Sequence, residues 1–211
     1  MRFLTLIVGI LCIPIISKAQ AGAAEFMVGD KYLHYQHSVA MPFNQTSRFG
    51  WQHIATLIKH HKFGNAKADL KDELMNQAYL TANLSKAFQL KGGVFYNDVG
   101  GYRLSTGIQF AAIKPNWMFV INPRLDLDKV TAYEVFMVSE FTPPINDRLR
   151  FYSRIQLMSN INRNQHLRSY QLIRVGISKD KFQMGAGVTL DEYGKDGRVH
   201  YNTGFFVRKE F

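Results

Sequence analysis

Cysteine is almost absent from this chain, which holds one cysteine in 211 residues. That residue, Cys12, lies within an apolar stretch at residues 3–16 that we expect to be removed from the mature protein. Leu11 precedes it, where a lipoprotein signal has a small residue, so we expect no lipid anchor. A mature chain without cysteine has no disulfide, thiol nucleophile or cysteine metal site.

Long apolar runs are also lacking beyond residue 16, and the mean hydropathy is -0.15. No later segment approaches the ~20 apolar residues that a membrane-spanning helix needs. The apolar stretch itself follows Met1-Arg2 and precedes small residues at 17–21. This pattern predicts a signal peptide over residues 1–20, cleaved after Ala19 or Ala21. A mature N-terminus at Gln20 resembles exported proteins of Bacteroidota.

Acidic residues are fewer than basic ones, 16 against 26, which gives a formal net charge of +10. A basic surplus favours anionic substrates, lipopolysaccharide phosphates or nucleic acid. We expect no nucleic acid, because an exported chain carries this charge without any binding motif. Gly185-Ala186-Gly187 lacks the third glycine of a nucleotide loop, and no nucleophile elbow is present. We therefore expect no cofactor.

What the sequence does contain is alternation of apolar and polar residues from residue 74 onward. A period of two predicts β-strands with one apolar face, and it excludes helices, whose apolar residues recur at three and four. The last strand alternates up to the terminal residue Phe211, with Phe206 as the exception on its polar face. Its apolar face comprises Val199, Tyr201, Thr203, Phe205 and Val207.

A terminal aromatic closing such a strand resembles the C-terminal signature of bacterial outer-membrane β-barrels, here formed by Tyr201, Phe205, Val207 and Phe211. Lys209 departs from the pattern. The resemblance covers residues 50–211 and implies an all-β, transmembrane, antiparallel up-and-down barrel in the outer membrane. It also implies contact with outer-membrane lipid, lipopolysaccharide and the barrel assembly machinery. A soluble β-sandwich would alternate too, but the signal peptide and the aromatic residues near strand ends favour the barrel.

Nine strands are predicted after residue 73, and residues 51–60 supply a tenth. We expect about ten strands, with eight or twelve left open, because residues 21–49 could contribute strands or form a periplasmic or lumenal segment. Short turns are predicted at 85–87, 114–116, 143–147 and 179–180, on the side of the C-terminus. The opposite side receives loops at 61–73, 98–101, 128–130, 160–166 and 193–197.

The polar face of the predicted strands is rich in charge, and charges in an interior of low dielectric should pair. We expect a ladder joining Glu134 and Glu140 to the arginines of the next two strands. Two interpretations stay open: a lumen plugged by side chains, and a narrow anion-preferring pore, since arginine exceeds carboxylate. The predicted lumen charge network comprises Arg103, Arg124, Glu134, Glu140, Arg150, Arg154, Arg168, Arg174, Asp191 and Arg198.

Catalytic signals are weak. His60 and His61 lie beside a predicted outer loop with Asp69 and Asp72, which loosely resembles the sites of omptin proteases and lipid A-modifying enzymes. No family motif is matched, and acid–base catalysis needs a positioned pair. We therefore expect a structural, adaptor or narrow-channel barrel rather than an enzyme. A subunit of a larger outer-membrane complex and a surface hydrolase of lipid A or peptide are the alternatives. His34 and His37 alone are weak evidence for a metal, and we expect none.

Overall fold

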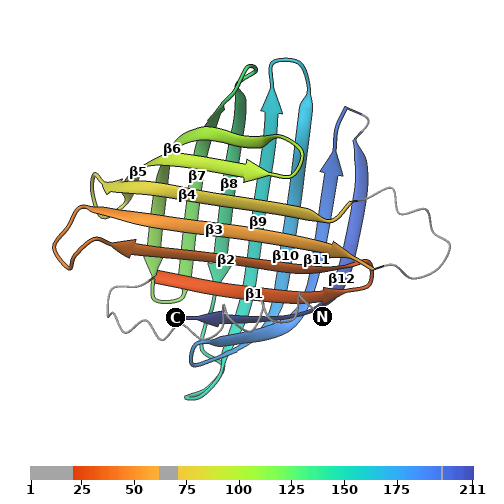
Figure 1. The fold of residues 1–211 in the computed structure, drawn as a ribbon. Coiled ribbons are helices and arrows are strands. Elements are labelled where there is room, and N and C mark those ends of the chain that lie inside the picture. Colours follow the sequence, from red (N-terminus) through yellow and green to blue (C-terminus); the bar gives the residue numbers. More distant parts are fainter. Residues whose placement is uncertain (1–20, 62–70, 196) are drawn as a thin grey trace, which may run out of the picture.

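The protein is a closed barrel of twelve antiparallel strands (Figure 1). The computed structural model describes residues 21–61, 71–195 and 197–211. Each strand pairs with the next along the chain, and β1 closes the ring by pairing with β12. The strands are β1 (Ala21–Gly29), β2 (Tyr32–Pro42), β3 (Phe49–His60), β4 (Glu73–Asn83), β5 (Phe88–Asn97), β6 (Gly101–Lys114), β7 (Trp117–Leu127), β8 (Ala132–Phe141), β9 (Arg150–Asn162), β10 (His166–Lys179), β11 (Phe182–Tyr193) and β12 (Arg198–Glu210).

Twelve strands is the upper of the numbers that the sequence left open; the preferred number of about ten is too low, because residues 21–42 form β1 and β2. The barrel therefore begins at Ala21 and not at residue 50. These two strands lack the alternation seen elsewhere. β1 opens with the small residues of 21–24, and β2 carries polar side chains on both faces, such as His34 and His37. The predicted signal peptide lies outside the described residues.

The alternation of the later strands is confirmed. On β12, Phe205 faces outward and is 77% exposed, whereas its neighbour Phe206 faces the lumen and is 1% exposed. Tyr201 and Val207 share the outer face with Phe205. The backbone nitrogen of Phe211 donates a hydrogen bond to the Gly22 carbonyl oxygen at 3.0 Å, which ties the C-terminus to the first strand.

The up-and-down order divides the connections between two ends of the barrel. The predicted turns after β4, β6, β8 and β10 lie at the end that holds the C-terminus, here named the terminal end. The predicted loops lie at the opposite end, here named the loop end, although residues 62–70 of one of them are outside the described part. Among the described residues, no helix is long and apolar enough to cross a membrane.

Candidate functional site in the lumen

Side chains from opposite walls of the barrel meet directly inside it. β4 and β10 are six strands apart in a ring of twelve, so they lie on opposite sides. Arg168 of β10 nevertheless donates a hydrogen bond from Nη1 to Glu73 Oε2 of β4 at 2.7 Å. Its Nε donates to Asp191 Oδ1 of the adjacent β11 at 2.9 Å, and the Tyr193 hydroxyl donates to Glu73 Oε1 at 2.7 Å. We call Glu73, Arg168, Asp191 and Tyr193 the upper cluster, since it lies toward the loop end.

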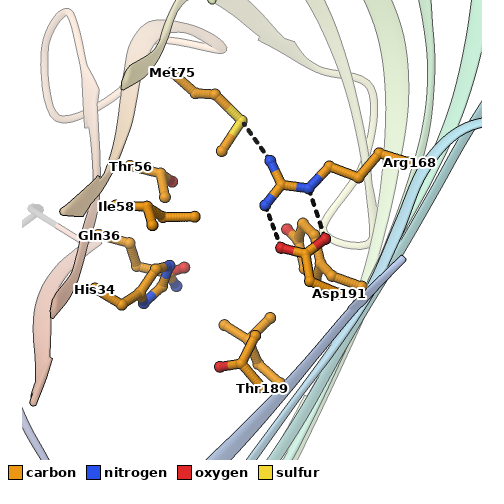
Figure 2. Close-up of a pocket in the computed structure, with 10 residues that line it drawn as sticks. His34, Gln36, Thr56, Ile58, Met75, Arg168, Thr189 and Asp191 are labelled. Carbon is orange, nitrogen blue, oxygen red and sulfur yellow. Dashed lines mark hydrogen bonds and ion pairs between the residues drawn. The ribbon is translucent and has the colours of Figure 1, made fainter. Parts of the chain in front are cut away.

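Figure 2 shows Arg168 and Asp191 of this cluster on one wall of the lumen and Met75 on the other. Arg168 Nη1 lies 3.7 Å from Met75 Sδ. Beside this contact, His34 and Thr189 face a cavity of about 20 Å³. A space of that size holds about one water molecule. The upper cluster therefore leaves little free volume around it.

A second cluster is built around two acids. Glu25 of β1, only 2% exposed, lies 2.9 Å from Arg174 Nε and 3.4 Å from Arg154 Nη1. Glu140 of β8 lies 3.4 Å from Arg154 Nε and 3.4 Å from Arg208 Nη2. These ion pairs connect charged side chains of β1, β8, β9 and β10 to Arg208 on β12. We call Glu25, Glu140, Arg154, Arg174 and Arg208 the middle cluster.

An apolar group packs against the middle cluster. Met27, Tyr152 and Phe206 form a hydrophobic core and are at most 1% exposed. Tyr152 and Phe206 come from β9 and β12 and have ring centroids 5.8 Å apart. Such packing excludes water from the charged groups beside it, which strengthens their attraction. The middle of the lumen is thus occupied by both charged and apolar side chains.

A third cluster surrounds Arg124 on β7. Its guanidinium lies 3.0 Å from Asp126 and 2.8 Å from Glu134, and it donates to Gln77 Oε1 of β4 at 3.0 Å. The Phe95 ring lies 4.5 Å from the guanidinium carbon, close enough for a cation–π contact. Arg124, Asp126 and Glu134 form what we call the side cluster.

The predicted charge network is brought together in part. Arg124, Glu134, Glu140, Arg154, Arg168, Arg174 and Asp191 all take part in the three clusters. Arg103 forms a separate pair with Asp128 at 3.5 Å. Arg150 does not join the network, because it lies at the strand end and binds Asn116 Oδ1 at 2.8 Å. Arg198 is exposed at the start of β12 and does not join it either.

The pairing differs from the expected ladder between neighbouring strands. Only Arg154 and Glu140 pair as expected, whereas Glu134 binds Arg124 on the other side of its strand. The sequence interpretation missed Glu25 and Glu73, which each bind arginines across the lumen. Extending the strand assignment to residues 21–29 would have placed Glu25 on the same face as the buried Met27.

These missed acids change the charge balance of the lumen. Within the described residues, the three clusters hold five arginines and six carboxylates, so the arginine excess expected for the lumen is offset there. The arginines are Arg124, Arg154, Arg168, Arg174 and Arg208. The carboxylates are Glu25, Glu73, Asp126, Glu134, Glu140 and Asp191.

Of the candidate catalytic histidines, His60 lies on the lumen side at the loop end, where its ring packs against the buried Tyr32 with centroids 5.2 Å apart. The His60 backbone nitrogen donates to Asp72 Oδ1 at 2.9 Å, whereas its ring Nδ1 is 4.0 Å from that oxygen. Lys59 also pairs with Asp72, and its hydrogen bond lowers the pKa of that carboxyl. The His61 ring contacts the Gly29 carbonyl oxygen at 2.9 Å. Asp69 lies outside the described residues.

No group of three histidine, cysteine, aspartate or glutamate side chains gathers to hold a metal ion in the described ranges. His34 and His37 cannot share a ligand, because residues three apart in a strand face opposite sides. His34 is buried in the lumen, and His37 lies on the outer face.

Comparison with known proteins supports the fold and leaves the family open. No family model and no curated protein sequence matches the chain. Among solved structures, it is similar to the KdgM porin (TM-score 0.51, 9% identity, 92% of this chain and 99% of that one). It is also similar to the NanC porin (0.51, 9%, 92% and 100%) and to an outer-membrane channel from Pseudomonas putida F1 (0.52, 11%, 93% and 97%). The chain therefore has the fold of outer-membrane porins and channels.

Proposed function

We propose that the protein is an integral outer-membrane barrel whose lumen is closed by its own side chains, with a structural or adaptor role. One observation carries this proposal: the hydrogen bond between Arg168 and Glu73, which joins strands on opposite sides of the barrel. An open diffusion pore needs free space between opposite walls, and here they are in contact. The middle cluster adds a second layer of contacts below it.

The outer surface supports the membrane location. Large apolar side chains are exposed around the barrel, including Leu80 at 66%, Leu104 at 64% and Phe205 at 77%. In water, so much exposed apolar surface would drive aggregation, whereas hydrocarbon accommodates it. The signal peptide, an origin in Bacteroidota and contacts with lipopolysaccharide and the assembly machinery remain predictions.

A narrow channel is the second candidate, favoured by the likeness to two porins and an outer-membrane channel. One of the similar structures is the KdgM porin in complex with disordered oligogalacturonate. A channel here would require Arg168 and Glu73 to separate. Any preference of such a channel for anions would have to arise from residues outside the three clusters, since their carboxylates outnumber their arginines. The pair of His60 and Asp72 at the rim gives no comparable support to an enzymatic function.

Two measurements test the proposal. Membrane fractionation with heat-modifiable gel migration should place the folded protein in the outer membrane, and a soluble protein without a shift would contradict the location. Purified protein in planar bilayers should then show no steady conductance. A stable open level of conductance would contradict the closed lumen and favour the channel.

A further inference from the structure

A run of hydrogen-bonded polar side chains lies on the outside of the barrel, across β2, β3 and β4, which are neighbours in Figure 1. His37 Nε2 is 2.8 Å from His53 Nδ1. The Tyr35 hydroxyl is 3.0 Å from His37 Nδ1, and His53 Nε2 is 3.1 Å from Asn76 Oδ1. We call Tyr35, His37, His53 and Asn76 the outer polar chain.

The strand register places all four side chains on the outer face. Residues directly opposite each other in a sheet share a face, and Tyr35 lies opposite Phe26 and Leu57, which are 45% and 39% exposed. His37 is two residues further along the same strand. His53 lies opposite Ala78, next to the exposed Val94 on β5.

Such a chain is unusual on a surface that faces hydrocarbon, and the inference rests on the proposed membrane location. Polar side chains in lipid are costly and mark interaction or transport sites. Elsewhere on the outer face, polar side chains within the strands include hydroxyls that bond to backbone oxygens, such as Thr106 and Ser153, as well as Gln171. Ser159 and Ser169 bond to each other there at 3.0 Å. Within the described strands, His37 and His53 place two adjacent imidazole rings on the outer face.

The hydrogen bonds fit one neutral assignment of protons. The Tyr35 hydroxyl donates to His37 Nδ1, His37 Nε2 donates to His53 Nδ1, and His53 Nε2 donates to Asn76 Oδ1. At one end of the outer polar chain, the Tyr35 oxygen is then an acceptor. At the other end, Asn76 Nδ2 offers two donors. Within the described residues, that amide nitrogen has no hydrogen-bond partner.

Small residues surround the outer polar chain. Ala55 lies between His37 and Asn76 in the paired strands, and Ala78 lies opposite His53. A Cβ added at Gly92, on the neighbouring β5, would meet no atom within 4 Å. Small residues and hydrogen-bonding side chains are the features that bring protein surfaces together within membranes.

We propose that this face binds a second copy of the chain within the membrane. A two-fold axis along the membrane normal relates two copies inserted in the same orientation, and it sets the same patch against itself. The Tyr35 end of one copy then faces the Asn76 end of the other. The free donors of one end meet the free acceptor of the other, so the patch is complementary to itself.

Cysteine cross-linking in native membranes tests this interface, because the sequence has no cysteine beyond Cys12. We expect Ala55→Cys, at the centre of the patch, to give a disulfide-linked dimer of twice the mass on mild oxidation. The matched control is Ile173→Cys, an outward residue of β10 on another wall, which should stay monomeric. Absence of the Ala55→Cys dimer, or its cross-linking to a protein of different mass, would overturn the proposal.

A second variant shows whether the polar side chains hold the copies together. Adding His37→Leu and His53→Leu to Ala55→Cys should reduce the dimer yield at least tenfold and leave heat-modifiable migration unchanged. An undiminished dimer yield would overturn the role of the outer polar chain. Fractionation separates these results from a failure of the membrane location, since all variants are tested only in the outer-membrane fraction.

Discussion

Glu25 illustrates how much one residue contributes to the lumen. Its carboxylate lies between Arg174 and Arg154, and Arg174 is 1% exposed. Glu25 is thus the acid that pairs with Arg174, and it shares Arg154 with Glu140. Water cannot replace that acid at so deep a position.

We predict that Glu25→Ala destabilises the folded barrel by about 3–5 kcal/mol, because removing one partner of a buried ion pair leaves uncompensated charge. Urea unfolding in detergent, followed by loss of heat-modifiable migration, measures this. Glu210→Ala is the control: the Glu210 side chain is 43% exposed and its partner Arg208 also binds Glu140, so we expect about 0–1 kcal/mol. Equal losses for the two variants would contradict the assigned role of Glu25.

At the scale of strands, β5 contains two adjacent glycines that face opposite sides. Gly93 faces the lumen, where an added Cβ would lie 2.0 Å from the backbone oxygen of Ala78 on β4. Gly92 faces outward into open space. The close approach of β4 and β5 therefore requires glycine at one of the two positions only.

Gly93→Ala should destabilise the barrel, by about 1–3 kcal/mol as is usual for overpacking, because a backbone oxygen cannot move aside as a side chain can. Gly92→Ala should leave the stability within about 0.5 kcal/mol, as for ordinary surface substitutions. Parallel urea titrations of the two variants compare them directly. A stable Gly93→Ala protein would show that β4 can shift away from β5.

The strands differ in how well the sequence predicts them. β4 to β12 follow from period-two alternation, since one face meets apolar surroundings and the other a polar lumen. β2 does not, because His37 and Tyr35 place polar atoms on the outer face as well, and β1 does not, because it opens with the small residues 21–24. The alternation predicts which charged residues face the lumen, but it does not predict which residues they pair with. The pairing of Arg168 with Glu73 depends on which strands face each other across a ring of twelve.

At the scale of the whole molecule, the closed lumen depends on contacts that cross it. The upper cluster is the layer that joins strands on opposite sides. The middle cluster joins strands that are closer together around the ring, such as β8 and β12. Loss of the upper cluster should therefore have the larger effect on opening.

We predict that combining Glu73→Ala, Arg168→Ala and Asp191→Ala gives transient openings in planar bilayers, because all three charged side chains of the crossing contact are removed together. Arg150→Ala is the control, since Arg150 binds Asn116 at the terminal end, away from the crossing contact. Single-channel recording should show openings for the triple variant and a flat trace for the control. A flat trace from a folded triple variant would indicate that the middle cluster alone closes the barrel.

The pairing of β1 with β12 has a consequence for how the chain folds. Ala23 lies opposite Glu210, so the bonds that close the ring join residues near opposite ends of the described chain. Until those bonds form, both strands have unpaired backbone edges, which hydrocarbon does not tolerate. The first strand must therefore be kept from pairing elsewhere until the last one arrives, and insertion into the bilayer becomes a single late event rather than a strand-by-strand one.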